Sequence, residues 1–386
     1  MKITGVELRT VRMPLVSPFT TSFGTETDRL AVLVRVVGKA GRPHSQPVEV
    51  QGWGECVAME RPLYSLEYAA GALEVMRRFL VPVLFGQGPT GLGPDGEITA
   101  ERVAALLEHV VGHRMAKAAV EMAVLDAQLR GTGQSLGGYL GAERHRVPAG
   151  VSVGVQPSIR ELIDVVGDYL AQGYLRIKLK IRPGWDVDPV EAVRERFGDR
   201  VALQVDANAA YTLADARILR RLDAFDLLLI EQPLAEDDIR QHAELARLIS
   251  TPICLDESIV SARAAADAIA LGAAQVINIK AGRVGGYLEA RRVHDLCRAG
   301  GIAVWCGGML ETGLGRAANA ALAALPGFTL PGDVSASDRF YARDITTPFV
   351  LADGHITVPT GPGLGVAPIQ DVLDAVTVDS TWLQPD

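Results

Sequence analysis

The sequence has few aromatic residues, four cysteines and no excess of positive charge. These shortages argue against particular classes of protein. Phe, Trp and Tyr make up 5% of the 386 residues, and no apolar run reaches the roughly 18 residues of a membrane helix. The 38 Lys and Arg residues against 46 Asp and Glu give a net charge of −8, which argues against nucleic acid or an anionic membrane as a partner. The N-terminal segment lacks the apolar core of a secretion signal. We therefore expect a soluble, cytoplasmic protein, in which scattered cysteines without CxxC spacing are buried thiols: Cys56, Cys254, Cys297 and Cys306.

The length of the chain exceeds what one hydrophobic core normally holds. Cores stop growing at roughly 250–300 residues, so 386 residues predict a large domain and a smaller one. The first 126 residues combine the strand patterns VELRTVRMP and RLAVLVRVV with helical stretches around 65–78 and 100–129, which indicates an α+β domain. The tail after about residue 340 is β-like again, and its Asp353-Gly354 turn predicts a hairpin. We expect this tail to pack on the N-terminal domain.

From about residue 148, short β-rich runs alternate with helix-compatible stretches at a period of about two dozen residues. Such alternation is typical of parallel βαβ units. Seven or eight units that close on themselves form a TIM-like barrel, and an open doubly wound sheet is the alternative. The eighth strand, near FTLPGDV, has the weakest pattern. The other runs are AGVSVGV, LRIKLKI, VALQVDA, LLLIEQP, PICLDES, AQVINIK and GIAVWCG.

Charged residues end four consecutive predicted strands. Asp206, Glu231, Asp256 and Lys280 follow one another at spacings of 25, 25 and 24 residues. The carboxyl ends of barrel strands face one mouth, where the active sites of TIM barrels lie. Three carboxylates there would repel one another, and a hard divalent cation such as Mg²⁺ or Mn²⁺ would relieve the repulsion. One acidic residue at a strand end is more often a helix cap, but a set in register indicates a site.

Two lysines alternate with apolar residues in the preceding run, IKLKI. Lys178 and Lys180 share one face of the strand, and the apolar face must pack on helices, so the lysines are expected to point into the barrel. Burial beside another cation is expected to lower a lysine pKa and to make an amine base available. If AGVSVGV is the first strand, these lysines lie on strand two and Lys280 lies on strand six, across the mouth.

Bases on opposite sides of a cation site favour abstraction of a proton α to a carboxylate. The cation and a lysine would stabilise the resulting enediolate. Return of the proton on the other face gives racemisation, whereas one base and a leaving group give β-elimination. A Schiff-base aldolase that uses one of the lysines as nucleophile stays open, although it has no need of three carboxylates. A metal-stabilised binding protein without turnover also stays open, although the lysines argue against it.

Three shorter motifs compete with this interpretation. Gly86-x-Gly88-x-x-Gly91 matches a dinucleotide pattern, but no helix follows it. Gly150-x-Ser152-x-Gly154 matches a nucleophile elbow, but it fits the first barrel strand better. His109 and His113 are four residues apart on a predicted helix, without a third metal ligand, and a solvated or core pair is the favoured interpretation.

The charged set resembles that of the enolase superfamily, in its muconate-lactonising branch. Segments across nearly the whole chain are similar to the o-succinylbenzoate synthase / N-succinylamino acid racemase family, and the stretch 38–52 departs from it by its length. The resemblance implies an α/β fold: a (β/α)7β barrel over residues 127–339, with an α+β capping domain formed by residues 1–126 and about 340–386. The similar segments are PFTTSFGT (18–25), GECVAMERPLYSLE (54–67), GVSVG (150–154), KAGRVGG (280–286) and WCGGMLETGLGRAAN (305–319).

The resemblance also implies an activity. It is metal-dependent proton abstraction from a succinylated or N-acyl carboxylate, by an o-succinylbenzoate synthase of menaquinone biosynthesis, an N-succinylamino acid racemase, or both. Dipeptide epimerase and muconate cycloisomerase are alternatives within the superfamily. The cofactor implied is Mg²⁺, for which Mn²⁺ or another divalent cation can substitute, and a homo-oligomer is expected.

The resemblance assigns roles residue by residue. The metal ligands are Asp206, Glu231 and Asp256. Lys180 is the proton-abstracting base, Lys178 steadies the enediolate, and Lys280 is the second acid/base or a cation beside the intermediate. The remaining residues bind substrate or lie beside the site: Asn208 and Glu257 near the metal, Ser152, Gly308 and Met309 at the acyl pocket, Arg283 after Lys280, and Phe19, Phe23 and Met59 in the capping loops.

Overall fold

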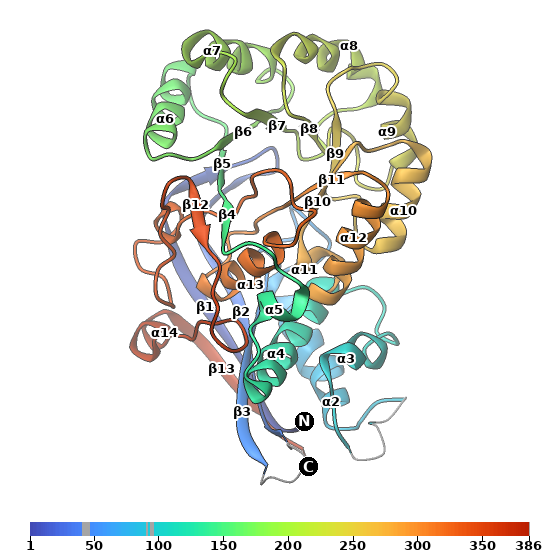
Figure 1. The fold of residues 1–386 in the computed structure, drawn as a ribbon, viewed down its shortest axis with the longest axis vertical. Coiled ribbons are helices and arrows are strands. Elements are labelled where there is room, and N and C mark those ends of the chain that lie inside the picture. The colour runs from blue at the N-terminus through green and yellow to red at the C-terminus, as the bar shows by residue number, and fades with distance from the viewer. Residues whose placement is uncertain (41–46, 90–91, 93–95, 386) are drawn as a thin grey trace.

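The computed structural model describes residues 1–40, 47–89, 92 and 96–385, in which a barrel stands against a capping domain (Figure 1). Gly91 of the dinucleotide-like motif and part of the unusual stretch 38–52 lie outside the described residues. The described ends of that stretch belong to strands, because β2 ends at Ala40 and β3 begins at Val48. These two ends pair with each other in the antiparallel sheet.

The capping domain is built on one antiparallel sheet of order β13-β1-β2-β3. The first strand pairs with the last one along Val6–Val11, so the C-terminal tail completes the N-terminal sheet as the sequence predicts. The predicted strands VELRTVRMP and RLAVLVRVV lie within β1 and β2, which are longer than expected. The strands are β1 (Lys2–Thr20), β2 (Thr25–Ala40), β3 (Val48–Cys56) and β13 (Thr377–Leu383).

Helix α4 packs on this sheet at very short range. A Cβ atom on Gly52 or Gly54 of β3 would come within 2.3 Å of the α4 backbone, so only glycine permits this approach. The helix predicted over 100–129 is broken before α4, where Gly112 and His113 adopt φ values of 70° and 51°. The helices of this region are α1 (Ala69–Val75), the π-helical η1 (Met76–Leu80), α2 (Val81–Leu84), α3 (Ala100–Leu106), α4 (Arg114–Thr132) and α5 (Leu136–Leu140). The predicted domain boundary at 126/127 falls inside α4, and the division into domains stays a prediction.

Seven parallel strands form the barrel wall, in the order β11-β10-β9-β8-β7-β6-β5 (Figure 1). All seven predicted runs contain one of these strands, and an eighth position is filled without a regular strand. There Gly332 bridges Ala149 while Phe328 bridges Val304, so the FTLPGDV segment lies between the first strand and β11. The strands are β5 (Gly150–Val153), β6 (Arg176–Lys180), β7 (Leu203–Asp206), β8 (Ile230–Glu231), β9 (Ile253–Leu255), β10 (Val276–Ile279) and β11 (Ala303–Cys306).

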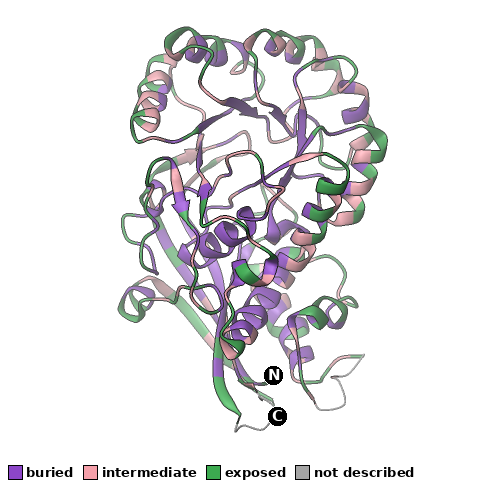
Figure 2. Cartoon of the chain, viewed as in Figure 1, coloured by how far each residue is buried: buried purple, intermediate pink, exposed green. Residues whose placement is uncertain are grey.

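Helices cover the outside of the barrel, and several of them begin at side-chain caps. Ser158 and Ser261, for example, each accept a hydrogen bond from a backbone N–H of the first turn. Figure 2 shows buried residues along the barrel strands and exposed residues on the outer helices. The helices are α6 (Ile159–Ala171), α7 (Val187–Phe197), η2 (Leu213–Asp215), α8 (Ala216–Leu219), η3 (Arg220–Phe225), α9 (Ile239–Leu245), α10 (Ala262–Leu271), α11 (Ala281–Val284), α12 (Tyr287–Ala299) and α13 (Gly313–Ala323).

Two buried carboxylates join the cap to the barrel. Glu55 of β3 accepts hydrogen bonds from the backbone N–H groups of Thr312 and Gly315 at the start of α13, both at 3.0 Å. Glu121 of α4 accepts from the N–H groups of Tyr287 and Leu288 at the start of α12, at 3.1 and 3.0 Å. Because helix N-termini carry unpaired donors and a partial positive charge, these contacts fix the cap against the barrel.

The segment between the barrel and β13 crosses back to the cap. The predicted hairpin at Asp353-Gly354 is only a tight turn with a bridge between Ala352 and His355, because β12 pairs with β4 instead of with the preceding run. The elements here are β4 (Arg146–Pro148), η4 (Ser337–Arg339), β12 (His355–Thr357) and α14 (Gln370–Val376).

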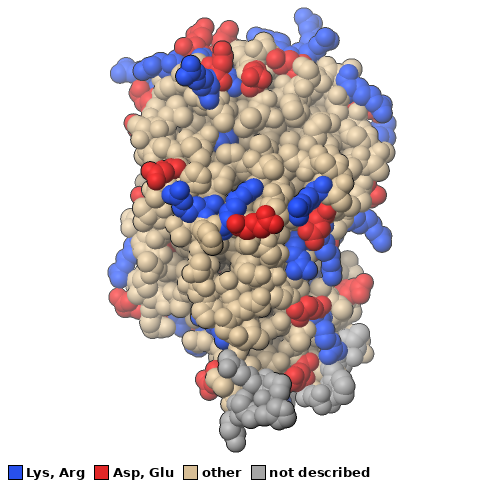
Figure 3. Space-filling model, in the orientation of Figure 1, with Lys and Arg blue, Asp and Glu red and all other residues tan. Residues whose placement is uncertain are grey.

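The distribution of surface charge, the character of the helices and the state of the cysteines can be compared with what the composition predicts. Lys and Arg residues lie interspersed with Asp and Glu on the face shown in Figure 3, rather than in one basic patch. Across the described part of the chain, no helix combines the length and apolar character that crossing a bilayer demands. The four cysteines are free and buried, as predicted.

Candidate active site

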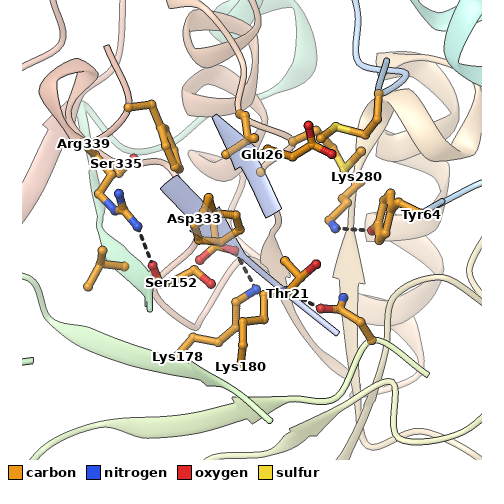
Figure 4. Close-up of a pocket in the computed structure, with 18 of the residues that line it drawn as sticks. Thr21, Glu26, Tyr64, Ser152, Lys178, Lys180, Lys280, Asp333, Ser335 and Arg339 are labelled. Atoms are coloured by element: carbon orange, nitrogen blue, oxygen red, sulfur yellow. Dashed lines mark hydrogen bonds and ion pairs between the residues drawn. The ribbon is translucent and has the colours of Figure 1, made fainter. Parts of the chain in front are cut away.

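A cavity lies where the capping loops meet the barrel mouth (Figure 4). It contains residues of both β1–β2 and the barrel strands, so neither domain forms it alone. Ten of the fifteen predicted site residues line it: Phe19, Phe23, Met59, Ser152, Lys178, Lys180, Asn208, Lys280, Gly308 and Met309. The other five, Asp206, Glu231, Asp256, Glu257 and Arg283, are buried behind its wall.

Lys178 lies in the middle of an ionic cluster on the β6 side. Its Nζ atom is 3.0 Å from Glu231 Oε2 and 2.7 Å from Asp333 Oδ2. It also lies 4.7 Å from the centroid of the Trp305 ring, a cation–π contact. These contacts fix the ammonium group at the cavity wall.

Lys180, two residues on, faces the same cavity with different partners. Its Nζ atom donates to Asp206 Oδ2 at 2.6 Å and to Asn208 Oδ1 at 2.7 Å. The amide of Asn208 in turn donates to Glu257 Oε1 at 3.0 Å. Asn208 therefore connects the lysine of strand two with the residue that follows Asp256.

Lys280 follows β10, on the other side of the mouth. Its Nζ atom donates to Asp256 Oδ2 at 2.7 Å and to the Tyr64 hydroxyl at 2.8 Å. Arg283 of α11 donates to the same hydroxyl, and its Nε atom is 3.4 Å from Asp256 Oδ1. Tyr64 comes from the cap, so a capping-loop residue contacts this lysine directly.

The carboxylates set the electrostatics of the site. Burial and the charge of Asp206 raise the pKa of Glu231, whereas for Asp206 itself the effect of burial is outweighed by Lys180 and Lys178, which lower its pKa. Burial and the charge of Asp256 raise the pKa of Glu257 to about 7.

The expected lowering of the lysine pKa is wrong for two of the three lysines. Burial alone would lower the pKa of Lys178, but the charges of Asp333, Glu231 and Asp206 outweigh it and raise that pKa. The pKa of Lys280 is raised in the same way, chiefly by Asp256. Burial and the neighbouring cations lower a lysine pKa, but the carboxylates around Lys178 and Lys280 have the larger effect and raise it.

The three predicted metal ligands fit a hard cation by chemistry. Within the described ranges, no three Asp, Glu, His or Cys side chains are gathered as a ready ligand group. Each of the three carboxylates instead holds a lysine. All three are buried oxygen donors at the ends of adjacent strands, and Asp256 Oδ1 and Glu257 Oε2 are enclosed without a hydrogen-bond partner. Carboxylate oxygens are the donors that Mg²⁺ and similar ions prefer.

Several residues of the site were missed or left undecided by the sequence interpretation. Asp333 holds Lys178 and Arg176, and Arg339 and Phe340 line the cavity. The sequence around Pro62 leaves Tyr64 open between a lid residue and a core residue, and in the structure it contacts Lys280. Asp333 could have been found, because it follows FTLPG as a charged residue at the eighth strand position. His109 and His113 lie between α3 and α4 and outside the cavity lining, contrary to the predicted helical pair.

Asp333→Asn is expected to destabilise the protein by about 3 kcal/mol, because it leaves Lys178 and the fully buried Arg176 without their shared carboxylate. Urea unfolding followed by circular dichroism measures the effect. Asp371→Asn is the matched control, since Asp371 pairs with Arg343 where both side chains are more than 60% exposed, and it should change stability by about 1 kcal/mol or less. Equal small changes in the two variants would show that the Asp333 cluster adds no net stability.

A seven-stranded parallel barrel whose mouth holds lysines and carboxylates beneath a cap defines a class of barrel enzymes. Residues 161–372 match the family described as "Enolase C-terminal domain-like", and residues 3–141 match the "Mandelate racemase / muconate lactonizing enzyme, N-terminal domain". The chain therefore belongs to the enolase superfamily, and it is an enzyme of the mandelate racemase / muconate lactonizing enzyme family. Enzymes of this group are generally dependent on divalent metals and act on small carboxylates.

Two relatives and one solved structure align with almost the whole chain. The chain is 64% identical to an N-succinylamino acid racemase from Amycolatopsis sp, over 99% of this chain and 100% of that protein. It is 49% identical to an o-succinylbenzoate synthase from Geobacillus kaustophilus, over 95% and 93%. A solved structure of an enolase superfamily member from Listeria innocua Clip11262 superposes with a TM-score of 0.91 at 38% identity, covering 100% of this chain and 99% of that one. The predicted family and fold are thus confirmed.

Proposed function

We propose that the protein abstracts the proton α to the carboxylate of a succinylated or N-acyl substrate, with Lys180 and Lys280 as the two acid/base groups. The observation that carries the proposal is their placement. Lys180 ends the second strand of the barrel, Lys280 follows the sixth, and both line one cavity. Strands two and six face each other in an eight-position barrel, so the two amines can address opposite faces of one carbon.

Asp206, Glu231 and Asp256 are the proposed ligands of a divalent cation, for which Mg²⁺ is our choice. When bound, the cation supplies Lewis-acid stabilisation of negative charge on the substrate carboxylate. Lys178 supports the same negative charge from the β6 side, where Asp333 and Glu231 hold it in position. Asn208 and Glu257 extend this polar wall beside Lys180.

The substrate class follows from the relatives together with the cavity. N-succinylamino acid racemase and o-succinylbenzoate synthase are the names of the two most similar proteins given above, and we propose one or both activities for this chain. Ser152, Gly308 and Met309 are proposed to contact the acyl arm, and Phe19, Phe23 and Met59 to cover it from the capping loops. All six line the cavity beside the lysines.

A parallel assay of both reactions tests the proposal. With Mg²⁺ present, we expect α-proton exchange into D₂O from an N-succinyl amino acid, and o-succinylbenzoate from its cyclohexadiene precursor. Product from one assay alone would assign that single activity. Activity only on an Ala-Glu dipeptide or on muconate would move the protein to another branch, and borohydride trapping of a carbonyl substrate without need of metal would indicate a Schiff-base aldolase.

We further propose a cytoplasmic homo-oligomer. Leu66 and Val111, both in the capping region, are 90% and 89% exposed, which supports a surface that is covered by another subunit. Size-exclusion chromatography with light scattering gives the mass of the particle, and a monomer at micromolar concentration would contradict the oligomer.

A further inference from the structure

Arg339 borders the cavity on the side of Ser152, whereas Lys280 and Tyr64 lie on the other side (Figure 4). It is the last residue of η4, between the eighth strand position and the returning tail. The residue is 9% exposed, and its Nη2 atom donates to the carbonyl oxygen of Ser152 at 2.9 Å. Ser152 in turn lies opposite Lys178 in the β5–β6 register, so the guanidinium group is one strand away from the catalytic cluster.

This guanidinium group has no anionic partner. Among the described residues, no carboxylate forms a salt bridge with Arg339, and its Nε atom is enclosed without a hydrogen-bond acceptor. Asp333, which also lines the cavity, is already held by Arg176 and Lys178. Since arginine stays protonated in proteins, this is a buried charge that is not neutralised.

Aromatic rings surround the group instead of carboxylates. The guanidinium carbon lies 4.8 Å from the centroid of Phe340, 5.1 Å from Tyr169 and 5.7 Å from Phe19. Cation–π contacts of this kind hold the charge in place and exclude water, and they leave the in-plane donors that Ser152 does not use available to an anion. The arrangement is that of a preorganised carboxylate site.

The space beside Arg339 is larger than the catalytic cavity alone. A second cavity adjoins it, and Arg339 and Phe19 line both. Its other lining includes Gly154, Gln156 and Tyr169, at the end of the first strand and on α6. An arm that runs from the lysines past Ser152 would therefore reach Arg339 before it enters this second space.

We propose that Arg339 binds the terminal carboxylate of the succinyl arm and thereby selects succinylated substrates over neutral N-acyl ones. The inference rests on the proposed function, which places the reacting carboxylate at the lysine cluster. In this scheme the second carboxylate of the same substrate binds the guanidinium group of Arg339, away from the lysine cluster. Arg339 is a binding and specificity residue in this scheme, and the proton transfer itself does not need it.

Substitution of Arg339 tests the assignment through substrate preference. Arg339→Met is expected to lower kcat/KM for an N-succinyl amino acid roughly 30- to 100-fold, and for the N-acetyl derivative of the same amino acid by less than about threefold. Arg339→Lys keeps the charge and should recover part of the loss. Arg343→Met, at an exposed ion pair, is the matched control and should leave both values unchanged.

A measurement on the wild-type enzyme guards against a variant that fails to fold. Methylation of the terminal carboxylate of the N-succinyl substrate is expected to lower kcat/KM by a similar factor. Equal kcat/KM for the acid and its methyl ester would overturn the proposal, as would an equal loss on both substrates in Arg339→Met. A loss of succinyl preference in Arg182→Met instead would assign the carboxylate to the far wall of the second cavity.

The results also distinguish failure of the Arg339 assignment from failure of the proposed function. Wild-type exchange with either substrate, combined with unchanged preference in Arg339→Met, overturns the inference and leaves the proposed function standing. No exchange with any succinyl or acetyl substrate in the presence of Mg²⁺ overturns both.

Discussion

Lys180→Ala is expected to lower proton abstraction by roughly 10²- to 10⁴-fold, the contribution typical of a positioned general base. The reason is its position: the Nζ atom lies at the cavity wall, held 2.6 Å from Asp206 and 2.7 Å from Asn208. The loss should fall on kcat rather than on KM, because the amine acts on the α-proton and the acyl arm lies elsewhere. Exchange of the α-proton into D₂O, followed by NMR, measures this step without product formation.

Lys180 and Lys280 are expected to abstract the α-proton from different enantiomers of the substrate. Because they lie on opposite sides of the mouth, Lys180→Ala is expected to suppress exchange from one enantiomer of an N-succinyl amino acid, and Lys280→Ala from the other. Racemisation should be lost in both variants, since it needs removal on one face and return on the other. Equal suppression of both enantiomers by each substitution would contradict a two-base arrangement.

Stability controls keep this result interpretable. Asp206 remains 3.4 Å from Lys178 when Lys180 is removed, so its buried charge still has a partner and the barrel should stay folded. Lys39→Ala, at an exposed position of β2, is the matched control for loss of a lysine and should keep full exchange. Full exchange in Lys180→Ala would refute the assignment of the base.

The strand-end residues could be predicted from the sequence because residues that recur at the spacing of the βα units lie at the same end of the barrel. Each βα unit has nearly constant length, so charged residues about 25 positions apart arrive at one mouth whatever the details of the helices. Lys178 and Lys180 follow from the two-residue period of a strand in the same way. Both placements depend on local geometry alone, and both are found in the fold.

Contacts that depend on long-range packing could not be found this way. Tyr64 reaches Lys280 because the cap is held on the barrel by Glu55 and Glu121, whose hydrogen-bond partners at the starts of α13 and α12 are 257 and 166 residues away in the sequence. Arg339 lies beyond the eighth position, which lacks a regular strand, so no periodicity marks it. The break before α4 is a similar case, since the left-handed conformations at Gly112 and His113 override a strong helical pattern.

Removal of divalent metal is expected to lower the activity at least about 10³-fold while the protein stays folded. The loss follows from the Lewis-acid stabilisation of substrate charge, which is worth several kcal/mol at tenfold per 1.36 kcal/mol. The metal-free protein should stay folded because lysines neutralise the buried carboxylates. Each proposed ligand has an ammonium partner within 3.0 Å: Asp206 with Lys180, Glu231 with Lys178 and Asp256 with Lys280.

Because every proposed ligand has a lysine partner, the prediction separates activity from stability. After EDTA treatment, thermal unfolding should remain cooperative, and added Mg²⁺ should restore activity and raise the free energy of unfolding by about 2.7 kcal/mol at 100 times its Kd. Asp256→Asn should weaken both responses to Mg²⁺, whereas Asp371→Asn on the surface should change neither. Full activity in EDTA would refute the metal site, and unfolding in EDTA would show that the lysines do not neutralise the carboxylates on their own.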